Sequence, residues 1–176
     1  MRRFVLMASA TWFALAGSVH AQVRPGEAPP DLLGTEPSGA QVHVSDYRGK
    51  VVVLAFWATW CPYCLKELPI LENLQRRVGK DRIQVVAIDT DADHGKYRAM
   101  RRHLEGFQLT LAEDEGRGRI ADHYGVTGLP HMVMIDKAGR VAHVHIGYSE
   151  EILGSLVDEI NALLDAPASP AAQAGS

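Results

Sequence analysis

The most constraining feature of this sequence is an unbroken apolar run that leads into a cysteine pair and then into a helical pattern. Residues 51–57 read VVVLAFW, and an apolar run without alternation is typical of a strand buried on both faces of a sheet. The segment after it predicts an amphipathic helix, because apolar side chains recur every three or four residues, at Leu65, Leu68, Leu71, Leu74 and Val78. Cys61 and Cys64 therefore lie where a core strand meets the N-terminus of a helix.

Strand and helix patterns alternate along the rest of the chain. Further strands are predicted at residues 83–88, 109–111, 131–135 and 141–146, and further helices at residues 94–105, at 117–124 and after Ser149. The last two strands flank Asp136–Gly139, which is typical of a hairpin turn. This order predicts an α/β fold with a central mixed sheet flanked by helices on both faces.

Composition divides the chain into four parts. Residues 22–40 are rich in proline and glycine, which predicts an extended lead-in without regular elements, and residues 41–165 form the predicted domain. The Ala/Pro/Ser-rich residues 166–176 predict a disordered tail. Within the domain we expect the acidic residues 113–115 to form a solvated loop. The last helix should bury Ile152, Leu153, Leu156, Val157, Ile160, Leu163 and Leu164.

The first 21 residues are predicted to be a cleavable signal peptide. Arg2 and Arg3 precede an apolar stretch, and the small residues Val19 and Ala21 fit a cleavage site after Ala21. An uncleaved anchor is the alternative, although a membrane-spanning helix needs about 20 apolar residues. Export predicts a periplasmic protein in an oxidising compartment.

Charge and cysteine content exclude two classes of protein. The chain carries 18 Lys+Arg against 21 Asp+Glu, a net charge of −3, so it lacks the basic surface that a nucleic-acid backbone requires. It has 2 cysteines in 176 residues, so it is not a scaffold stapled by several disulfides. We therefore expect no nucleic-acid partner.

The position of the two cysteines predicts redox chemistry. Unpaired backbone N–H groups and the helix dipole stabilise a thiolate at a helix N-terminus, where the pKa of a cysteine falls from about 8.5 into the range of about 3.5–7.5. Cys61 is thus the expected nucleophile, and Cys64, about one helical turn on, is the expected resolving thiol. A structural zinc site would need two more Cys or His ligands, and the sequence offers no further cysteine and no His-x-x-x-His spacing. We predict no metal and no cofactor.

Two segments carry a resemblance to a known family. Residues 51–69, VVVLAFWATWCPYCLKELP, resemble the active-site segment of the thioredoxin superfamily. Within them, residues 56–61 resemble the exported branch that includes TlpA, ResA and the cytochrome c maturation thioredoxins. Residues 124–130, YGVTGLP, resemble the family segment that ends in a cis-proline. The resemblance extends over residues 40–165, which is nearly the whole predicted domain.

The resemblance implies a thioredoxin-like fold and a thiol–disulfide oxidoreductase. Such a protein would reduce cysteine pairs of client proteins, in cytochrome c or copper-centre assembly, would be re-reduced by a membrane thiol transporter, and would act as a monomer. Pro130 is expected to be cis and to leave the backbone of Leu129 open to a substrate chain. Trp60, Pro62 and Tyr63 are expected to contact the substrate, whereas Trp57 is expected to be a core residue.

The sequence departs from the family pattern at two places. The Pro62-Tyr63 dipeptide is the one familiar from glutaredoxins, although no glutathione-binding set is present. Ala55 stands where thioredoxins carry a buried aspartate, and the ResA-like branch places a glutamate at the position of Glu67. Glu67 is therefore expected to exchange a proton with Cys64, three residues away on the helix. The alternative is a surface glutamate favoured by the helix dipole.

Three histidines are candidate metal ligands, and two alternative functions are considered. His143 and His145 share one strand face by the period of two, and His131 lies on the neighbouring strand, where it would approach them across the pair. A packed or solvated face is favoured over metal binding. A copper-handling protein resembling the Sco family would use the thiols and a histidine, but that family's cysteines have three intervening residues. The other alternative is a disulfide-forming oxidant, in which the same two cysteines would pass electrons in the opposite direction.

Overall fold

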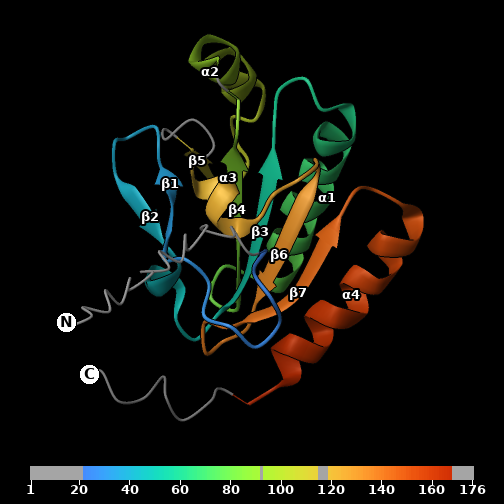
Figure 1. Ribbon diagram of the computed structural model, residues 1–176. Helices are drawn as coiled ribbons and strands as arrows, with labels where there is room; N and C mark the ends of the chain where they lie inside the picture. Colours follow the sequence, from blue (N-terminus) through green and yellow to red (C-terminus); the bar gives the residue numbers. More distant parts are fainter. Residues whose placement is uncertain (1–21, 92, 115–118, 168–176) are drawn as a thin grey trace, which may run out of the picture.

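The computed structural model describes residues 22–91, 93–114 and 119–167. These residues form a seven-stranded sheet in the order β2-β1-β5-β4-β3-β6-β7 (Figure 1). The strands are β1 (Leu32–Thr35), β2 (Gln41–His43), β3 (Val51–Trp57), β4 (Ile83–Asp89), β5 (Thr110–Glu113), β6 (His131–Ile135) and β7 (Val141–Ile146). β3 pairs in parallel with β4 and antiparallel with β6, so the predicted mixed sheet is confirmed.

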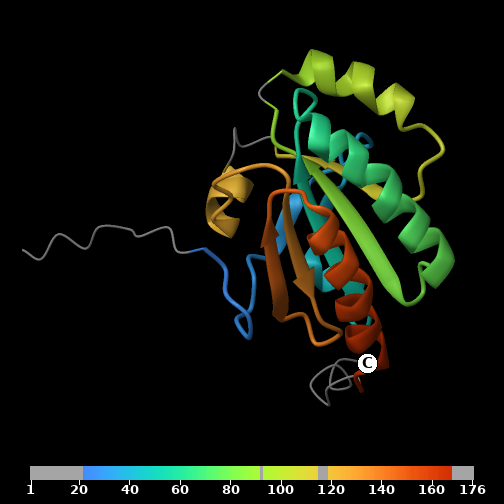
Figure 2. The same ribbon diagram turned by 90° about the vertical axis from the view of Figure 1, so that its right-hand side faces the viewer.

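Four α-helices of the described chain cover the two faces of this sheet. They are α1 (Pro62–Val78), α2 (His94–His103), α3 (Arg119–Tyr124) and α4 (Glu150–Asp165), and a short 3₁₀ helix, η1, spans Val44–Tyr47. Figure 2 shows α1, α2 and α4 on one face and α3 on the other. We name these the α1 face and the α3 face. The predicted α/β fold with helices on both faces is confirmed.

The core consists of two apolar clusters, one on each face. β3 supplies both, because successive side chains of a strand point to opposite sides. Val53, Ala55 and Trp57 pack on the α1 face with residues of α1, α2 and α4. Leu54 and Phe56 pack on the α3 face with residues of α3 and the lead-in. Since all seven residues of β3 are buried, the strand end that precedes the cysteines is fixed within the core.

The structure corrects the prediction for the lead-in, because this segment contains β1. β1 pairs with β2 and, at Thr35, with Glu113 of β5. β1 has four residues and β2 has three, which is too short for a periodic pattern to be recognised in the sequence. They are strands because they pair with neighbouring strands of the sheet.

The prediction of a solvated loop at residues 113–115 is wrong for Glu113 and Asp114. Glu113 belongs to β5, and Asp114 is buried and accepts hydrogen bonds from the backbone N–H groups of Ile120 and Ala121, both at 3.0 Å. The Asp114 carboxylate thereby satisfies donors at the start of α3. Glu115 lies outside the described residues.

The last helix buries a narrower face than predicted. Leu156, Ile160 and Leu164 are buried, whereas Val157 is 51% exposed. A helix lying against a sheet buries only the stripe that faces it, and Val157 lies beside that stripe. No helix in the described parts of the chain is long and apolar enough to span a membrane. The predicted signal peptide and residues 168–176 of the predicted tail lie outside the described residues.

Candidate active site

Cys61 and Cys64 form a disulfide at the N-terminus of α1, with their Cα atoms 5.3 Å apart. Cys61 is the N-cap residue, and its Sγ accepts a hydrogen bond of 3.2 Å from the backbone N–H of Cys64. Pro62 is the first helical residue, a position where its missing N–H costs nothing. Cys64 is fully buried, and Cys61 keeps 4% of its surface exposed. An external group therefore reaches Cys61 before Cys64.

The loop before Cys61 is tied to the end of the neighbouring strand. The carbonyl oxygen of Trp57 accepts hydrogen bonds from the Thr90 backbone N–H at 2.9 Å and from the Thr90 hydroxyl at 3.1 Å. The Asp91 carboxylate accepts from the backbone N–H and the hydroxyl of Thr59. These bonds join the ends of β3 and β4, so they fix the disulfide relative to the sheet.

Glu67 lies on the buried side of α1 and is only 2% exposed. Burial raises the pKa of its carboxyl from 4.5 to about 7. Residues three apart on a helix share a face, so Glu67 and Cys64 both point toward the sheet. The reading of Glu67 as a surface residue is therefore wrong, because a solvated carboxylate would not be enclosed in this way.

A second buried acid, Asp89, was not identified from the sequence. It ends β4, lies opposite Trp57 in the parallel ladder and is 2% exposed. Burial and the nearby negative charge of Asp91 raise its pKa from 3.8 to about 7. The Oδ1 atom of Asp89 and the indole N–H of Trp57 are buried without a hydrogen-bond partner in the described structure. The signal in the sequence was an acid that directly follows an apolar strand pattern.

The loop before β6 carries the predicted cis-proline. The Leu129–Pro130 peptide bond is cis, which confirms that prediction. Leu129 is half-buried and packs against the apolar clusters of both faces. The Pro130 carbonyl accepts a hydrogen bond of 2.8 Å from the Gly147 N–H, in the loop between β7 and α4.

The aromatic residues around the disulfide divide into a core residue and exposed residues. Trp57 is fully buried, which confirms the core prediction, whereas Trp60 and Tyr63 are exposed. The Tyr63 ring stacks on Tyr148, with ring centroids 5.6 Å apart and planes inclined by 25°. The ammonium group of Lys66 lies 5.4 Å from the Tyr63 centroid. The contact with Tyr148 was not predicted, because it joins residues 85 positions apart in the sequence.

The structure separates the three histidines that the sequence analysis grouped. The hairpin register places His143 and His145 on the α1 face and His131 on the α3 face, where it packs edge-on against Phe56. His145 bonds Glu159 at 2.7 Å, and its ring stacks on that of His143. The expected approach of His131 across the strand pair is wrong, because His131 pairs with Ile146, one position away from His145, and successive pairs of a ladder point to opposite faces. Within the described residues, no group of three His, Cys, Asp or Glu side chains is arranged to hold a metal ion.

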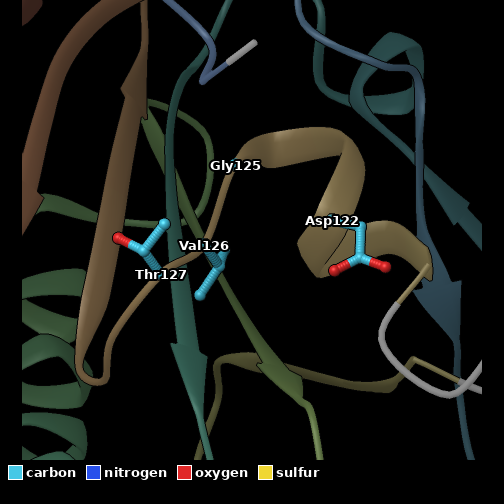
Figure 3. A pocket seen from close by; sticks show the side chains of 4 residues that line it. All are labelled: Asp122, Gly125, Val126 and Thr127. Carbon is cyan, nitrogen blue, oxygen red and sulfur yellow. The ribbon is translucent and has the colours of Figure 1, made fainter. Parts of the chain in front are cut away.

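A pocket lies where α3 ends and the chain turns toward β6 (Figure 3). Asp122, Gly125, Val126 and Thr127 line it. Gly125 has a φ of 69°, and a Cβ there would lie 2.4 Å from the Cα of Gln22, so only glycine fits this close approach. Asp122 is the one ionisable residue among the four, and none of them is a cysteine, so this pocket supplies no group for sulfur chemistry.

Comparisons with known proteins agree with this site. The Redoxin family model matches residues 24–164. The protein named thiol-disulfide oxidoreductase ResA from Bacillus thuringiensis subsp. konkukian is 33% identical over 118 residues, which span 66% of this chain and 66% of that protein. The thioredoxin-like protein YneN from Bacillus subtilis is 30% identical over 125 residues, 71% of this chain and 73% of that protein.

Solved structures give the same result. A putative thiol:disulfide interchange protein DsbE from Chlorobium tepidum superposes with a TM-score of 0.71 at 32% identity, covering 82% of this chain and 99% of that one. The resemblance read from residues 51–69 and 124–130 is thereby confirmed, both for the thioredoxin-like fold and for the ResA-like branch.

Proposed function

The chain belongs to the Redoxin family, and from this membership we propose that it is a thiol–disulfide oxidoreductase that reduces disulfides of client proteins through Cys61 and Cys64. One observation carries the proposal. The disulfide lies at the N-terminus of α1, where Cys61 is the N-cap residue and keeps 4% of its surface exposed, whereas Cys64 is fully buried. This is the arrangement that a nucleophile and a resolving thiol require.

The proposed reaction moves two electrons from the dithiol to the client. The Cys61 thiolate attacks one sulfur of the client disulfide, which forms a Cys61–client disulfide and releases the first client thiolate. The Cys64 thiolate then attacks Cys61 Sγ, which forms the Cys61–Cys64 disulfide and releases the second client thiolate. The dithiol is oxidised, and the client disulfide is reduced. The N–H of Cys64 and the α1 dipole stabilise the Cys61 thiolate in the first step.

Glu67 supplies the proton acceptor in the second step of this proposal. A buried thiol has a raised pKa, so Cys64 must pass its proton to another group before it attacks. Ala55 is buried at the position where thioredoxins carry an aspartate, and its side chain has no group that accepts a proton. The Glu67 carboxyl, with a pKa of about 7 and on the same helix face as Cys64, accepts the proton near neutral pH.

The compartment, inferred from the N-terminal sequence, and the partners, inferred from the family resemblance, are further parts of the proposal. The N-terminal pattern supports export to the periplasm with cleavage after Ala21, so the working protein would begin at Gln22. There it would act as a monomer on clients with cysteine pairs, in cytochrome c or copper-centre assembly, and a membrane thiol transporter would re-reduce it. Trp60, Pro62, Tyr63, Leu129 and Pro130 would contact the client.

A turbidity assay of insulin disulfide reduction, driven by a small dithiol, tests the proposed function. Cys61→Ser should reduce the rate to that of the dithiol alone, because the remaining thiol, Cys64, is fully buried and cannot reach a client disulfide. Cys64→Ser should form a mixed disulfide with the client and release it slowly. Thr59→Ser, which keeps the hydroxyl bonded to Asp91, serves as the control and should retain the wild-type rate. A Cys61→Ser protein with full activity would refute the proposal.

A further inference from the structure

Exposed apolar side chains gather around the disulfide. Among the described residues, five large hydrophobic side chains are exposed, and three of them lie at this end of the molecule: Trp60 at 67%, Tyr63 at 53% and Ile146 at 47%. Single exposed apolar residues are ordinary, but a group around a reactive site marks an interaction surface.

The loop between β7 and α4 connects the two segments of the redox site. Ile146 lies beside Gly128, since a Cβ on Gly128 would lie 3.9 Å from Ile146 Cγ2. The N–H of Gly147 bonds the Pro130 carbonyl. Tyr148 then stacks on Tyr63, in the first turn of α1. Residues 146–148 therefore contact both the cis-proline loop and the start of the cysteine helix.

We propose that Tyr63, Ile146 and Tyr148 form a recognition surface for a client segment that carries an aromatic or large apolar side chain next to its cysteine, and that Tyr148 sets this preference by positioning Tyr63. This inference rests on the proposed function, since the occupant is the client chain held on Cys61. A client sulfur bonded to Cys61 places the neighbouring client residues beside Tyr63, only two positions along the chain. The surface is thus continuous with the site of covalent attachment.

The chemistry of the surface favours an apolar neighbour. Tyr63 and Tyr148 present aromatic rings, which stack on apolar or aromatic groups. A polar client side chain would lose water there without gaining an equivalent partner. Lys66 and Tyr148 hold the Tyr63 ring in place before binding, so less side-chain entropy is lost when the client docks. Tyr148 is therefore a positioning residue that acts through Tyr63.

Two peptides with the same intramolecular disulfide, differing only in phenylalanine or serine beside the cysteine that is attacked, test the proposal. The wild-type dithiol protein should reduce the phenylalanine peptide with a kcat/KM about tenfold higher, the range expected for one aromatic pair. Tyr148→Ala should reduce this ratio to about twofold, mainly by raising KM for the phenylalanine peptide. Tyr148→Phe keeps the ring and should restore the wild-type ratio.

Two controls separate recognition from damage to the fold or the dithiol. Val157→Ala removes another exposed apolar side chain, on α4, and should leave the peptide ratio unchanged. Reduction of bis(2-hydroxyethyl) disulfide, which is too small to reach Tyr148, should be equal within about twofold in all variants, as an aromatic contact affects only groups that touch it.

The outcomes are distinct. Equal kcat/KM for both peptides, or a Tyr148→Ala protein that keeps the wild-type ratio, would overturn the recognition surface while leaving the small-disulfide activity intact. A wild-type dimer that Tyr148→Ala converts to a monomer would also overturn it, because the surface would then serve self-association. A wild-type protein that reduces neither peptide nor the small disulfide would overturn the proposed function itself, and the recognition surface with it.

Discussion

Burial shifts the pKa values of ionisable groups in opposite directions on the two faces of the sheet. On the α1 face, burial raises the pKa of Glu67 and Asp89 to about 7. On the α3 face, burial lowers the pKa of His131 to about 4. The cause is the same, because desolvation favours the neutral form of any group, an acid as well as a base. The α1 face therefore carries groups that change charge near neutral pH, and it is also the face on which the cysteines lie.

The buried groups on the two faces also have different surroundings. His131 is fully buried against Phe56, and neither ring nitrogen has a hydrogen-bond partner in the described structure. It behaves as a neutral aromatic core residue. Glu67 instead shares a buried helix face with Cys64, the thiol that loses a proton in the proposed reaction. Burial alone thus does not select a candidate functional group; Glu67 is proposed because its buried carboxyl lies on the same helix face as a redox cysteine.

The largest effect is expected for Glu67→Gln. A Cys61–client disulfide trapped in acid and shifted to higher pH should release its client in the wild type with a rate that rises through pH 7. The variant lacks the acceptor, so its rate at pH 8 should be lower by about 100-fold, within the range for general base catalysis. Quenched-flow release of a fluorescent peptide measures both rates.

Glu151→Gln is the matched control for this prediction, because Glu151 is exposed on α4. It should leave the release profile unchanged. Equal profiles for Glu67→Gln and the wild type would show that Cys64 loses its proton without Glu67.

A smaller effect, on stability, is expected for Asp89→Asn. The ordinary pKa of 3.8 rises to about 7 on folding, so between about pH 4 and 7 the folded protein holds a proton that the unfolded chain has lost. The contribution of Asp89 to the free energy of unfolding therefore falls as pH rises through this window, by at most about 1.4 kcal/mol per pH unit. Asp89→Asn removes this slope and should gain stability relative to the wild type from pH 5 to 7.5.

Urea unfolding of the oxidised protein at several pH values measures this difference. Asp122→Asn, an exposed aspartate on α3, provides the comparison on the opposite face. If both variants shift the pH profile equally, the slope does not arise from the buried carboxyl.

The smallest effect, with the opposite sign, is expected for His131→Leu. The unfolded chain gains a proton on this histidine below pH 6.5, whereas the folded protein does so only near pH 4. His131 therefore destabilises the wild type progressively as pH falls from 6.5 to 4. His131→Leu should lose less stability over that interval in the same urea assay. His103→Leu, at the exposed end of α2, is the control, and an equal change in both variants would contradict the assignment to His131.

The sequence predicted those parts of the molecule whose pattern is local. β3, α1 and the β6–β7 hairpin follow from runs, periodicity and turn residues within about 20 positions. The positions of Cys61 and Cys64 at the start of α1 follow from the same junction. The family resemblance, and no local pattern, predicted that Pro130 is cis and that Glu67 is a candidate proton acceptor for Cys64.

The features that the sequence did not predict depend on contacts between distant segments. β1 is a strand because β2 and β5 pair with it. The burial of Asp89 depends on the packing over the α1 face, and the contact between Tyr63 and Tyr148 depends on where the β7–α4 loop lies. Burial raises a carboxyl pKa only after the chain has folded, so the raised pKa values of Glu67 and Asp89 could not be predicted from the sequence.

The reduction potential of the Cys61–Cys64 pair tests the central claim most directly, because the same site would form disulfides in clients if its potential were high. Equilibration of the protein with defined ratios of reduced and oxidised glutathione, followed by alkylation and mass measurement, gives this potential. A client reductant should have a value of about −200 mV or lower. A value near about −120 mV, as in strongly oxidising dithiols, would contradict the account and assign the protein as an oxidant.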